Sequence, residues 1–454
     1  ASGSVTVGTD SVWKLTDALT IGGGGVGTLT IQERADVSGT AAYIGNGAGS
    51  TGSSVTVTGA GTTWTNTGAL FVGSFGNSTL QILAGAEVEN AEAVIGRHST
   101  SSVTVSGSGS TWTTGALLIG GDRSDTSSSV VGNGTLNILA AATVNGTSAV
   151  LGDSTGSEGT VNVDGSGSLW HLSDRVSVGG LGEGTVTITN GGHITSAGAL
   201  IGHEASGSGL VTISGDGSLW ENTGVFYVGN LGDGTLELLA GGDLTSTDGY
   251  VGTEDGSDST ATVDGAGSSW VMSGDFLVGH NDGAKGSVTI SAGGLIENRQ
   301  GILGDLAGSY GEMTVTGDGS LWDVSSDLNV GRIGEGALTI ALGGDVTAAR
   351  SLIGNNVGSE GNATVSGDGS TWVTSGGLYV GNEGTGTLTV ASGGYVSADE
   401  ITIANEVGST GTLIIGASRA YRGHGRQSGR LRPAIGGPDH PGFGQPDLCQ
   451  LRCR

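Results

Sequence analysis

The sequence predicts an all-β protein, a three-sided parallel β-helix of about 16 rungs with about 25 residues in each rung. Three observations lead to this fold class: a repeat of fixed period, short segments in which apolar residues alternate with Thr or Ser, and an unusual glycine content. Glycine supplies 94 of the 454 residues, far above the usual ~7%. It gathers between the short segments, where turns need positive φ.

The repeat is marked by the first apolar residue of each triplet such as V-T-V. These anchors are Val5, Leu29, Val55, Leu80, Val103, Leu136, Val161, Val186, Val211, Leu236, Ala261, Val288, Met313, Leu338, Ala363, Leu388 and Leu413. From Val161 onward the step is 25 residues apart from one step of 27, whereas the step from Val103 to Leu136 carries the insertion "GGDRSDTSSSVVGNG". Self-similarity at such a period indicates a solenoid, a propeller or an array.

Two kinds of unit alternate along the chain. One reads VTV-x-G-x-G-S-x-W followed by L-x-V-G, and the other reads TLTI-x-x-G-G-x-V followed by a short apolar pair and Gly. Each unit holds three strand-like segments rich in Val, Thr and Ile, which suit a pleated surface. Stacked about 4.8 Å apart, sixteen rungs give a rod roughly 75–80 Å long. A β-propeller with one Trp in each blade is the alternative, but the likeness between the two units favours the β-helix.

All eight tryptophans occupy one slot of the repeat, and we expect them to be structural core residues. They are Trp13, Trp64, Trp112, Trp170, Trp220, Trp270, Trp322 and Trp372. The matching slot of the other unit holds Val144, Ile194, Leu244, Ile296 or Val346, which predicts an inward position. The alternative is an outward row of indoles that stack on the sugar rings of an extended glycan.

No pattern in the repeats indicates a catalytic, metal or cofactor site. The aspartates of the first turn belong to alternate rungs, about 10 Å apart, so one Ca²⁺ with ligands at about 2.3–2.6 Å cannot bridge them. They are Asp164, Asp216, Asp264, Asp318 and Asp368, and we interpret them as turn residues. The acidic residues are spread along the array, so we expect no enzyme, with a polysaccharide-degrading β-helix enzyme as an alternative.

Two tyrosines and the insertion are the candidate surface binding features. Tyr227 and Tyr379 occupy the middle of the L-x-V-type segment, which predicts outward side chains that could contact glycans. The insertion at 121–134 adds length to one repeat, and such extra length maps to a loop on the surface of a solenoid.

The charge distribution excludes some partners. The formal net charge is −27, and residues 1–416 contain only nine of the sixteen Lys and Arg residues. Because phosphate binding needs a basic stripe, no nucleic acid partner is expected. No apolar run of 18 residues occurs, so no membrane-spanning helix is predicted. No signal peptide precedes the opening "ASGSVTV", and we expect the chain to be a piece of something longer.

The composition changes abruptly near residue 417, which divides the chain into a repeat array over 1–416 and a tail over 417–454. The tail holds all four prolines, both cysteines and seven of the sixteen basic residues. We expect it to be disordered, either as a basic linker or as out-of-frame sequence. Cys449 and Cys453 are expected to have no structural role.

The units "VTVSGSGSTW…LLIG" at 103–120 and "GTLTV…GGYV" at 386–396 resemble the type V secretion and PEP-CTERM-associated repeats. Such repeats occur in the passenger regions of bacterial autotransporters. The resemblance covers residues 1–416 and implies a right-handed parallel β-helix that is displayed on or released from a Gram-negative surface. No β-barrel translocator and no sorting signal follow the array in this sequence.

The function expected from these features is that of a bacterial cell-surface or secreted structural and adhesive rod. Its partners would be a host or neighbouring cell surface, including glycans. The alternatives are a glycan-binding adhesin that uses exposed aromatic residues and the polysaccharide-degrading enzyme named above. The resemblance carries no catalytic motif onto this sequence.

Overall fold

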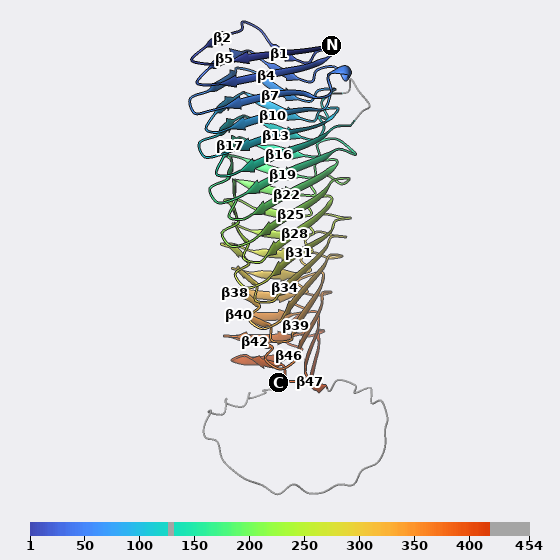
Figure 1. Cartoon of the computed structure of the whole chain (residues 1–454). Helices are drawn as coiled ribbons and strands as arrows, with labels where there is room; N and C mark the ends of the chain where they lie inside the picture. Colours follow the sequence, from blue (N-terminus) through green and yellow to red (C-terminus); the bar gives the residue numbers. More distant parts are fainter. Residues whose placement is uncertain (126–130, 418–454) are drawn as a thin grey trace, which may run out of the picture.

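The computed structural model describes residues 1–125 and 131–417. The chain coils into an elongated parallel β-solenoid of about sixteen turns, with the N-terminus at one end and strand β47 (Thr410–Ala417) at the other (Figure 1). The helical structure in the described residues is one short 3-10 turn, η1 (Ala48–Ser50). The predicted all-β fold class is therefore confirmed. The tail is predicted to be disordered. Its residues 418–454 lie outside the part of the chain that the structure describes, so this stays a prediction.

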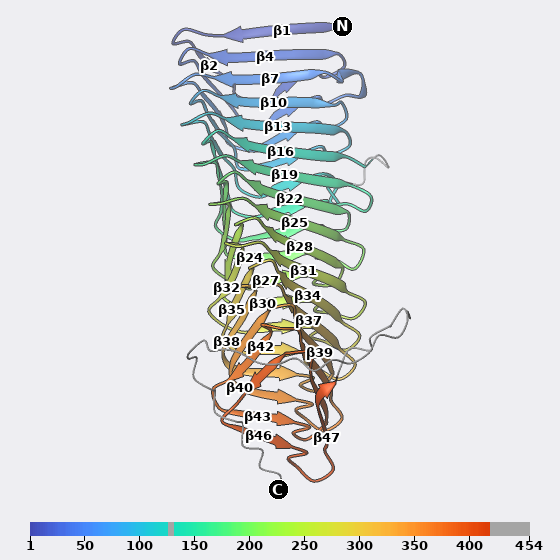
Figure 2. The same ribbon diagram turned by 60° about the horizontal axis from the view of Figure 1, so that its bottom comes forward.

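Each full turn contributes three strand segments. The first segments form a 17-stranded sheet, which Figure 2 shows as one continuous stack. Its strands are β1 (Ser2–Val7), β4 (Val26–Gln32), β7 (Ser53–Thr58), β10 (Ser78–Leu83), β13 (Thr100–Ser106), β16 (Asn133–Leu139), β19 (Glu158–Asp164), β22 (Glu183–Thr189), β25 (Ser208–Ser214), β28 (Asp233–Leu239), β31 (Asp258–Asp264), β34 (Lys285–Ser291), β37 (Tyr310–Thr316), β39 (Glu335–Ala341), β41 (Glu360–Ser366), β44 (Thr385–Ala391) and β47.

The second and third segments of each turn belong to a 30-stranded sheet. The second segments, which carry the tryptophan slot, are β2 (Val12–Lys14), β5 (Asp36–Gly39), β8 (Thr63–Asn66), β11 (Glu87–Glu89), β14 (Thr111–Thr113), β17 (Thr143–Gly146), β20 (Leu169–Leu172), β23 (His193–Ser196), β26 (Leu219–Asn222), β29 (Asp243–Ser246), β32 (Ser269–Met272), β35 (Leu295–Asn298), β42 (Thr371–Thr374) and β45 (Tyr395–Ser397). In β38 (Leu321–Val330) and β40 (Asp345–Ile353) the second and third segments run together.

The third segments complete each turn. They are β3 (Leu19–Ile21), β6 (Ala42–Ile44), β9 (Ala69–Val72), β12 (Glu92–Ile95), β15 (Leu117–Ile119), β18 (Ala149–Leu151), β21 (Arg175–Val178), β24 (Gly198–Ile201), β27 (Phe226–Val228), β30 (Gly249–Val251), β33 (Phe276–Val278), β36 (Gly301–Leu303), β43 (Gly377–Val380) and β46 (Glu400–Ile403).

The register of the 17-stranded sheet confirms the repeat. Each anchor residue pairs with the anchor of the next turn, as Val161 pairs with Val186 and Val186 with Val211. The insertion does not disturb this register, because Val103 still pairs with Leu136. All strand pairs among the described residues are parallel, which excludes a propeller of antiparallel blades. The right-handed coil implied by the family resemblance stays a prediction.

The Ser or Thr two residues before the tryptophan of the repeat closes a turn through hydrogen bonds. In "SGDGSLW" the Ser218 hydroxyl donates to the Ser214 carbonyl at 2.8 Å and accepts the Gly191 N–H of the preceding turn at 3.1 Å. Gly215 and Gly217 have φ of 92° and 78°, which most side chains disfavour. Thr62, Ser110, Ser168, Ser268, Ser320 and Ser370 make the same pair of bonds. The motif therefore recurs because each copy closes its own turn and ties it to the previous one.

Seven of the eight tryptophan side chains lie in the core. Trp64, Trp112, Trp170, Trp220, Trp270, Trp322 and Trp372 are at most 1% exposed. Trp13, in the first turn, is partly buried and packs against the same core. Trp220 pairs with Ile194 below and Leu244 above, so indoles and aliphatic side chains share one inward column. An outward indole row is therefore excluded for these seven residues.

The central turns contain a chain of aromatic rings packed edge to face. Phe226 lies between Trp220 and Trp270, with ring centroids 5.2 and 5.8 Å away. Phe276 continues the chain from Trp270, at 5.1 Å, to Trp322, at 6.5 Å. The ring planes meet at 65–88°, an arrangement that adds about 0.5–1.5 kcal/mol per pair beyond area burial.

A second inward column decides whether each indole N–H has a partner. The column lies two residues after the tryptophan slot, and the residue that faces each indole comes from the preceding turn. Four indole N–H groups donate to Asn or Ser there: Trp112 to Asn90 at 2.7 Å, Trp220 to Ser196 at 2.9 Å, Trp270 to Ser246 at 3.1 Å and Trp322 to Asn298 at 2.7 Å. Trp64, Trp170 and Trp372 have no such bond, because the same position holds Gly39, Gly146 and Ala348.

Candidate binding surface

The outward side chains of the third strand segments form a stripe along the rod. Successive members pair in register from turn to turn. They are Tyr43, Phe71, Val94, Leu118, Val150, Leu200, Tyr227, Tyr250, Leu277, Ile302, Leu352 and Tyr379, interrupted by Ser177 and Asn329. The predicted surface residues Tyr227 and Tyr379 both belong to this outer stripe but lie in well-separated turns, so the structure does not bring them together.

Tyr227 is half-buried in a stack rather than displayed as a flat platform. Its ring lies 4.9 Å from that of Tyr250, with 26° between the planes. On the other side its register partner is Leu200. One face of the Tyr227 ring is therefore covered by Tyr250 of the next turn. Burial, then the carboxylates of Asp248 and Glu254, raise the pKa of the Tyr227 hydroxyl, so it stays a protonated donor.

Side chains from the turns that follow β12 and β33 cover parts of the outer stripe. The Arg97 guanidinium lies 5.0 Å above the Phe71 ring, which itself stacks on Tyr43 at 5.0 Å. The His280 ring meets the Tyr250 ring edge-on at 5.3 Å. Aliphatic members of the stripe such as Ile302 are nearly as buried as the interior core. The stripe is thus an outer layer of packing with a partly polar cover.

Tyr379 differs from Tyr227 because no aromatic ring among the described residues packs against it. Its register neighbours are Leu352 and Thr402, and the position that a Cβ on Gly377 would take lies 2.8 Å from the Tyr379 ring. The side chain is partly exposed. Of the two predicted surface tyrosines, Tyr379 is the better placed to contact an external ligand.

The insertion is held at its start by ion pairs to the preceding turn. The Arg97 Nε lies 2.9 Å from the Asp122 carboxylate and 3.0 Å from that of Asp125. His98 Nε2 lies 3.0 Å from the same Asp125 oxygen. The two carboxylates are largely buried, with side-chain exposures of 5% and 12%. These contacts fix the first residues of the insertion against the rod.

Arg123 extends the attachment in the opposite direction. Its Nε lies 2.7 Å from Asp153, in the next turn, and its Nη1 lies 3.2 Å from Glu204, further along the rod. The Arg123 backbone N–H also donates to Asp153, at 2.8 Å. The predicted insertion is therefore clamped across several turns. Sequence reasoning located the insertion and missed the clamp, although acids and bases about one period apart, such as Arg97 and Asp122, were a signal for it.

Two of the five first-turn aspartates, Asp164 and Asp264, accept hydrogen bonds from side chains of the next turn. Asp164 Oδ1 accepts hydrogen bonds from Thr189 at 2.7 Å and Asn190 at 2.6 Å, and Asp264 accepts one from Ser291 at 2.6 Å. Within residues 1–125 and 131–417, no group of three or more His, Cys, Asp or Glu side chains is arranged to hold a metal ion.

Asp248 and Asp275 are two acids that interact across consecutive turns. Asp248 Oδ1 accepts the Asp275 N–H at 2.7 Å, and the Asp275 carboxylate accepts from Arg299 at 2.7 Å. Burial raises the pKa of Asp275, Arg299 lowers it, and Asp248 raises it again. The ion pair with Arg299 gives Asp275 a structural role, so this pair does not by itself indicate catalysis.

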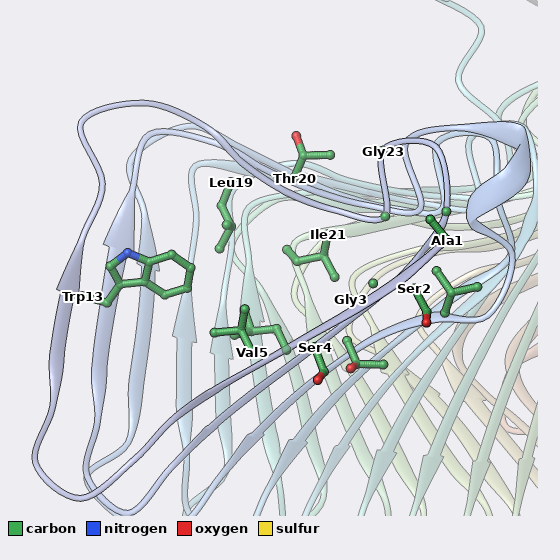
Figure 3. Close-up of a pocket in the computed structure, with 16 residues that line it drawn as sticks. Ala1, Ser2, Gly3, Ser4, Val5, Trp13, Leu19, Thr20, Ile21 and Gly23 are labelled. Carbon is green, nitrogen blue, oxygen red and sulfur yellow. The ribbon is translucent and has the colours of Figure 1, made fainter.

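The hollow at the N-terminal end of the rod is the uncovered end of the core. Val5, Trp13, Leu19 and Ile21 line it, and Figure 3 shows these side chains around an open space beside the first turn. The lining residues are those that other turns bury against a neighbour. The hollow therefore reflects the architecture of the solenoid and holds no convergent polar groups typical of a ligand site.

No protein-family model matches this chain, and no curated protein sequence matches it. Among solved structures, the crystal structure of a TibC-catalysed, hyper-glycosylated TibA fragment aligns with 91% of this chain and 100% of its own, at 16% identity and a TM-score of 0.30. An overlap this weak supports neither a shared fold nor a shared function. The resemblance to the type V secretion repeats stays a prediction. Among the described residues, no helix is long and apolar enough to span a membrane.

Proposed function

We propose that this chain is a structural and adhesive rod, displayed on or secreted from a bacterial cell in the manner of an autotransporter passenger. The observation that carries the proposal is that the polar and aromatic side chains of this chain join neighbouring turns of the rod. Serines close turns, indoles bond to the preceding turn, and tyrosines stack on the next. Groups that would serve chemistry in an enzyme here join neighbouring turns, as expected of a repeat array whose stability comes from nearest neighbours.

The adhesive part of the proposal places contact with a host or neighbouring cell at the insertion. This segment departs from the repeat, and its charged clamp runs over several turns through Arg97, Asp122, Arg123, Asp153 and Glu204. Variation carried by a loop on a rigid scaffold is a common way to build a recognition surface.

The test uses the purified full chain coupled to beads in a flow cell over cultured cells. One variant replaces residues 121–132 with the five-residue turn "DSTGS" that occurs naturally at 153–157. We expect the beads to lose adhesion while circular dichroism and the length of the rod in electron micrographs stay unchanged. A control that breaks an ion pair away from the insertion, Arg299→Gln, should keep adhesion. Full adhesion by the short-turn variant would move the contact elsewhere, and no adhesion by the native chain would reject the adhesive role.

A glycan-binding adhesin is a second candidate function, favoured by the lack of a stacked ring on Tyr379 among the described residues. Its neighbours in register are Leu352 and Thr402, so it lacks the ring partner that occupies Tyr227. Binding of the native chain to an array of extended glycans that is lost in Tyr379→Ala and kept in Tyr227→Ala would support this function. Equal binding by both variants would reject a role for Tyr379.

A further inference from the structure

The third turn contains an unusual group of buried polar atoms. The indole N–H of Trp64 and both amide atoms of Asn66 are buried without a hydrogen-bond partner, in side chains that are 1% and 2% exposed. Leaving a buried donor or acceptor unpaired costs about 1–3 kcal/mol per group. Three such atoms in one place point to a small ligand that bonds to at least two of them.

The neighbouring turn leaves room for this ligand. Gly39 is the register partner of Asn66 and occupies the position that holds Asn or Ser beneath four other indoles. A Cβ on Gly39 would lie 3.3 Å from the Asp17 carbonyl oxygen, 3.7 Å from Leu15 Cβ and 3.9 Å from Asn66 Oδ1. The contact with the Asp17 carbonyl is tight and the other two are ordinary, so Gly39, which has no side chain, leaves the place of the missing Asn or Ser side group bordered by polar oxygens.

Gly146 shows what a filled position looks like. It stands beneath Trp170, whose indole N–H is also unpaired. There a Cβ would lie 2.9 Å from Leu172 Cδ2, so an apolar side chain packs against the place of the missing side group. At the corresponding place in the third turn the chain has the polar Asn66. The two glycines are therefore equivalent in sequence position and different in their surroundings.

We propose that the space between Gly39, Trp64 and Asn66 binds one internal water molecule. A water can accept from the Trp64 N–H and donate to Asn66 Oδ1 and to the Asp17 carbonyl, within the two to four partners typical of buried waters. A cation would face the indole N–H, and an anion would face two carbonyl oxygens. The mixture of neutral donors and acceptors therefore selects water. The site replaces, in this turn, the side-chain hydroxyl that Ser246 supplies to Trp270.

The test compares two serine substitutions by NMR of ¹⁵N-labelled indoles in the full chain. We expect the Trp64 Nε1–H of the native protein to show cross-relaxation with a long-lived water and that of Trp322 to show none. Gly39→Ser should abolish the Trp64 signal to water, because the new hydroxyl takes its place. Gly146→Ser, the matched control, should leave that signal intact and lower stability through contact with Leu172.

Absence of the water signal at Trp64, or its persistence in Gly39→Ser, would overturn the proposal. If Gly39→Ser fails to fold, a crystal structure of the native chain that resolves ordered waters decides the matter. Density within hydrogen-bonding distance of Trp64 Nε1 and Asn66 Oδ1 supports the site, and an empty space there rejects it.

Discussion

The turns that carry Trp270 and Trp372 bury the same indole in the same column, yet they differ in how well the indole is supported. Trp270 donates its N–H to Ser246 and packs edge to face between Phe226 and Phe276. Trp372 has Ala348 in place of the serine, and its N–H is unpaired. The repeat therefore determines that the indole is buried. Whether the indole N–H has a hydrogen-bond partner depends on a single residue of the preceding turn.

The largest effect should come from removing the indole in the well-supported region. We expect Trp270→Ala to cost about 3–5 kcal/mol, the usual range for deleting a large aromatic from a core, and Trp372→Ala to cost less because fewer favourable contacts disappear. Repeat arrays need not unfold in one step, so the measurement is hydrogen exchange of the strands flanking each site. Equal loss of protection at the two sites would contradict the comparison.

Replacing tryptophan with phenylalanine isolates the contribution of the indole hydrogen bond to stability. Trp322→Phe leaves the Asn298 Oδ1 buried without its donor, which should cost about 1–3 kcal/mol beyond the packing loss. Trp372→Phe removes an N–H that has no partner, so it should cost the packing loss alone. Urea unfolding of both variants, followed by circular dichroism, gives the difference between them. If the two midpoints fall together, the bond to Asn298 contributes nothing.

The converse change should repair the weaker turn. Ala348→Ser places a hydroxyl where Ser246 stands beneath Trp270, and a bond to the Trp372 N–H should add about 0.5–1.5 kcal/mol. The Trp372 indole resonance should shift downfield as the bond forms, and exchange protection of β42 should rise. Ala348→Val, which fills similar space without an acceptor, is the control. An unchanged indole resonance would show that the hydroxyl does not reach.

The smallest expected effect is a loss of local stability as the pH is lowered. Burial lowers the pKa of His193 and His203 below the ordinary 6.5, with Glu221 and Glu204 opposing the shift only in part. The unfolded chain therefore binds more protons than the folded one as pH falls below 6.5, and these turns lose stability there. Residues 333–416, around Trp372, contain no histidine. Exchange measured at pH 7 and pH 5 should show loosening near His203 and none near Trp372, and His203→Gln should reduce the loosening.

The fold was predictable from sequence because the anchors repeat with the register itself. Consecutive anchors such as Val161, Val186 and Val211 stand 25 residues apart and pair directly. The period of the sequence therefore equals the number of residues from one strand to its neighbour in the sheet. The core position of the indoles was equally accessible, because Ile194 and Leu244 share their column. Local pattern and global fold agree at these positions, as expected of a sequence with little frustration.

The surface was less predictable. Tyr227 was expected to face out, and it does lie in the outer stripe, but its stack on Tyr250 was not foreseen. The turn lengths between strand segments vary, so partners on the third segments are not one full period apart in sequence. The clamp of Arg123 on Glu204 is harder still, because it joins residues 81 positions apart. Side chains that lie along the rod cannot be paired by period alone.

The parallel register also sets how the rod would respond to a pulling force. Each turn is bonded mainly to the turn above and below, so tension applied at the two ends would peel turns off one at a time instead of breaking the whole molecule at once. A freed turn of about 25 residues can extend by roughly 80–90 Å, against about 4.8 Å of rod lost. A tether of this kind would lengthen many-fold under load while the remaining turns stay folded.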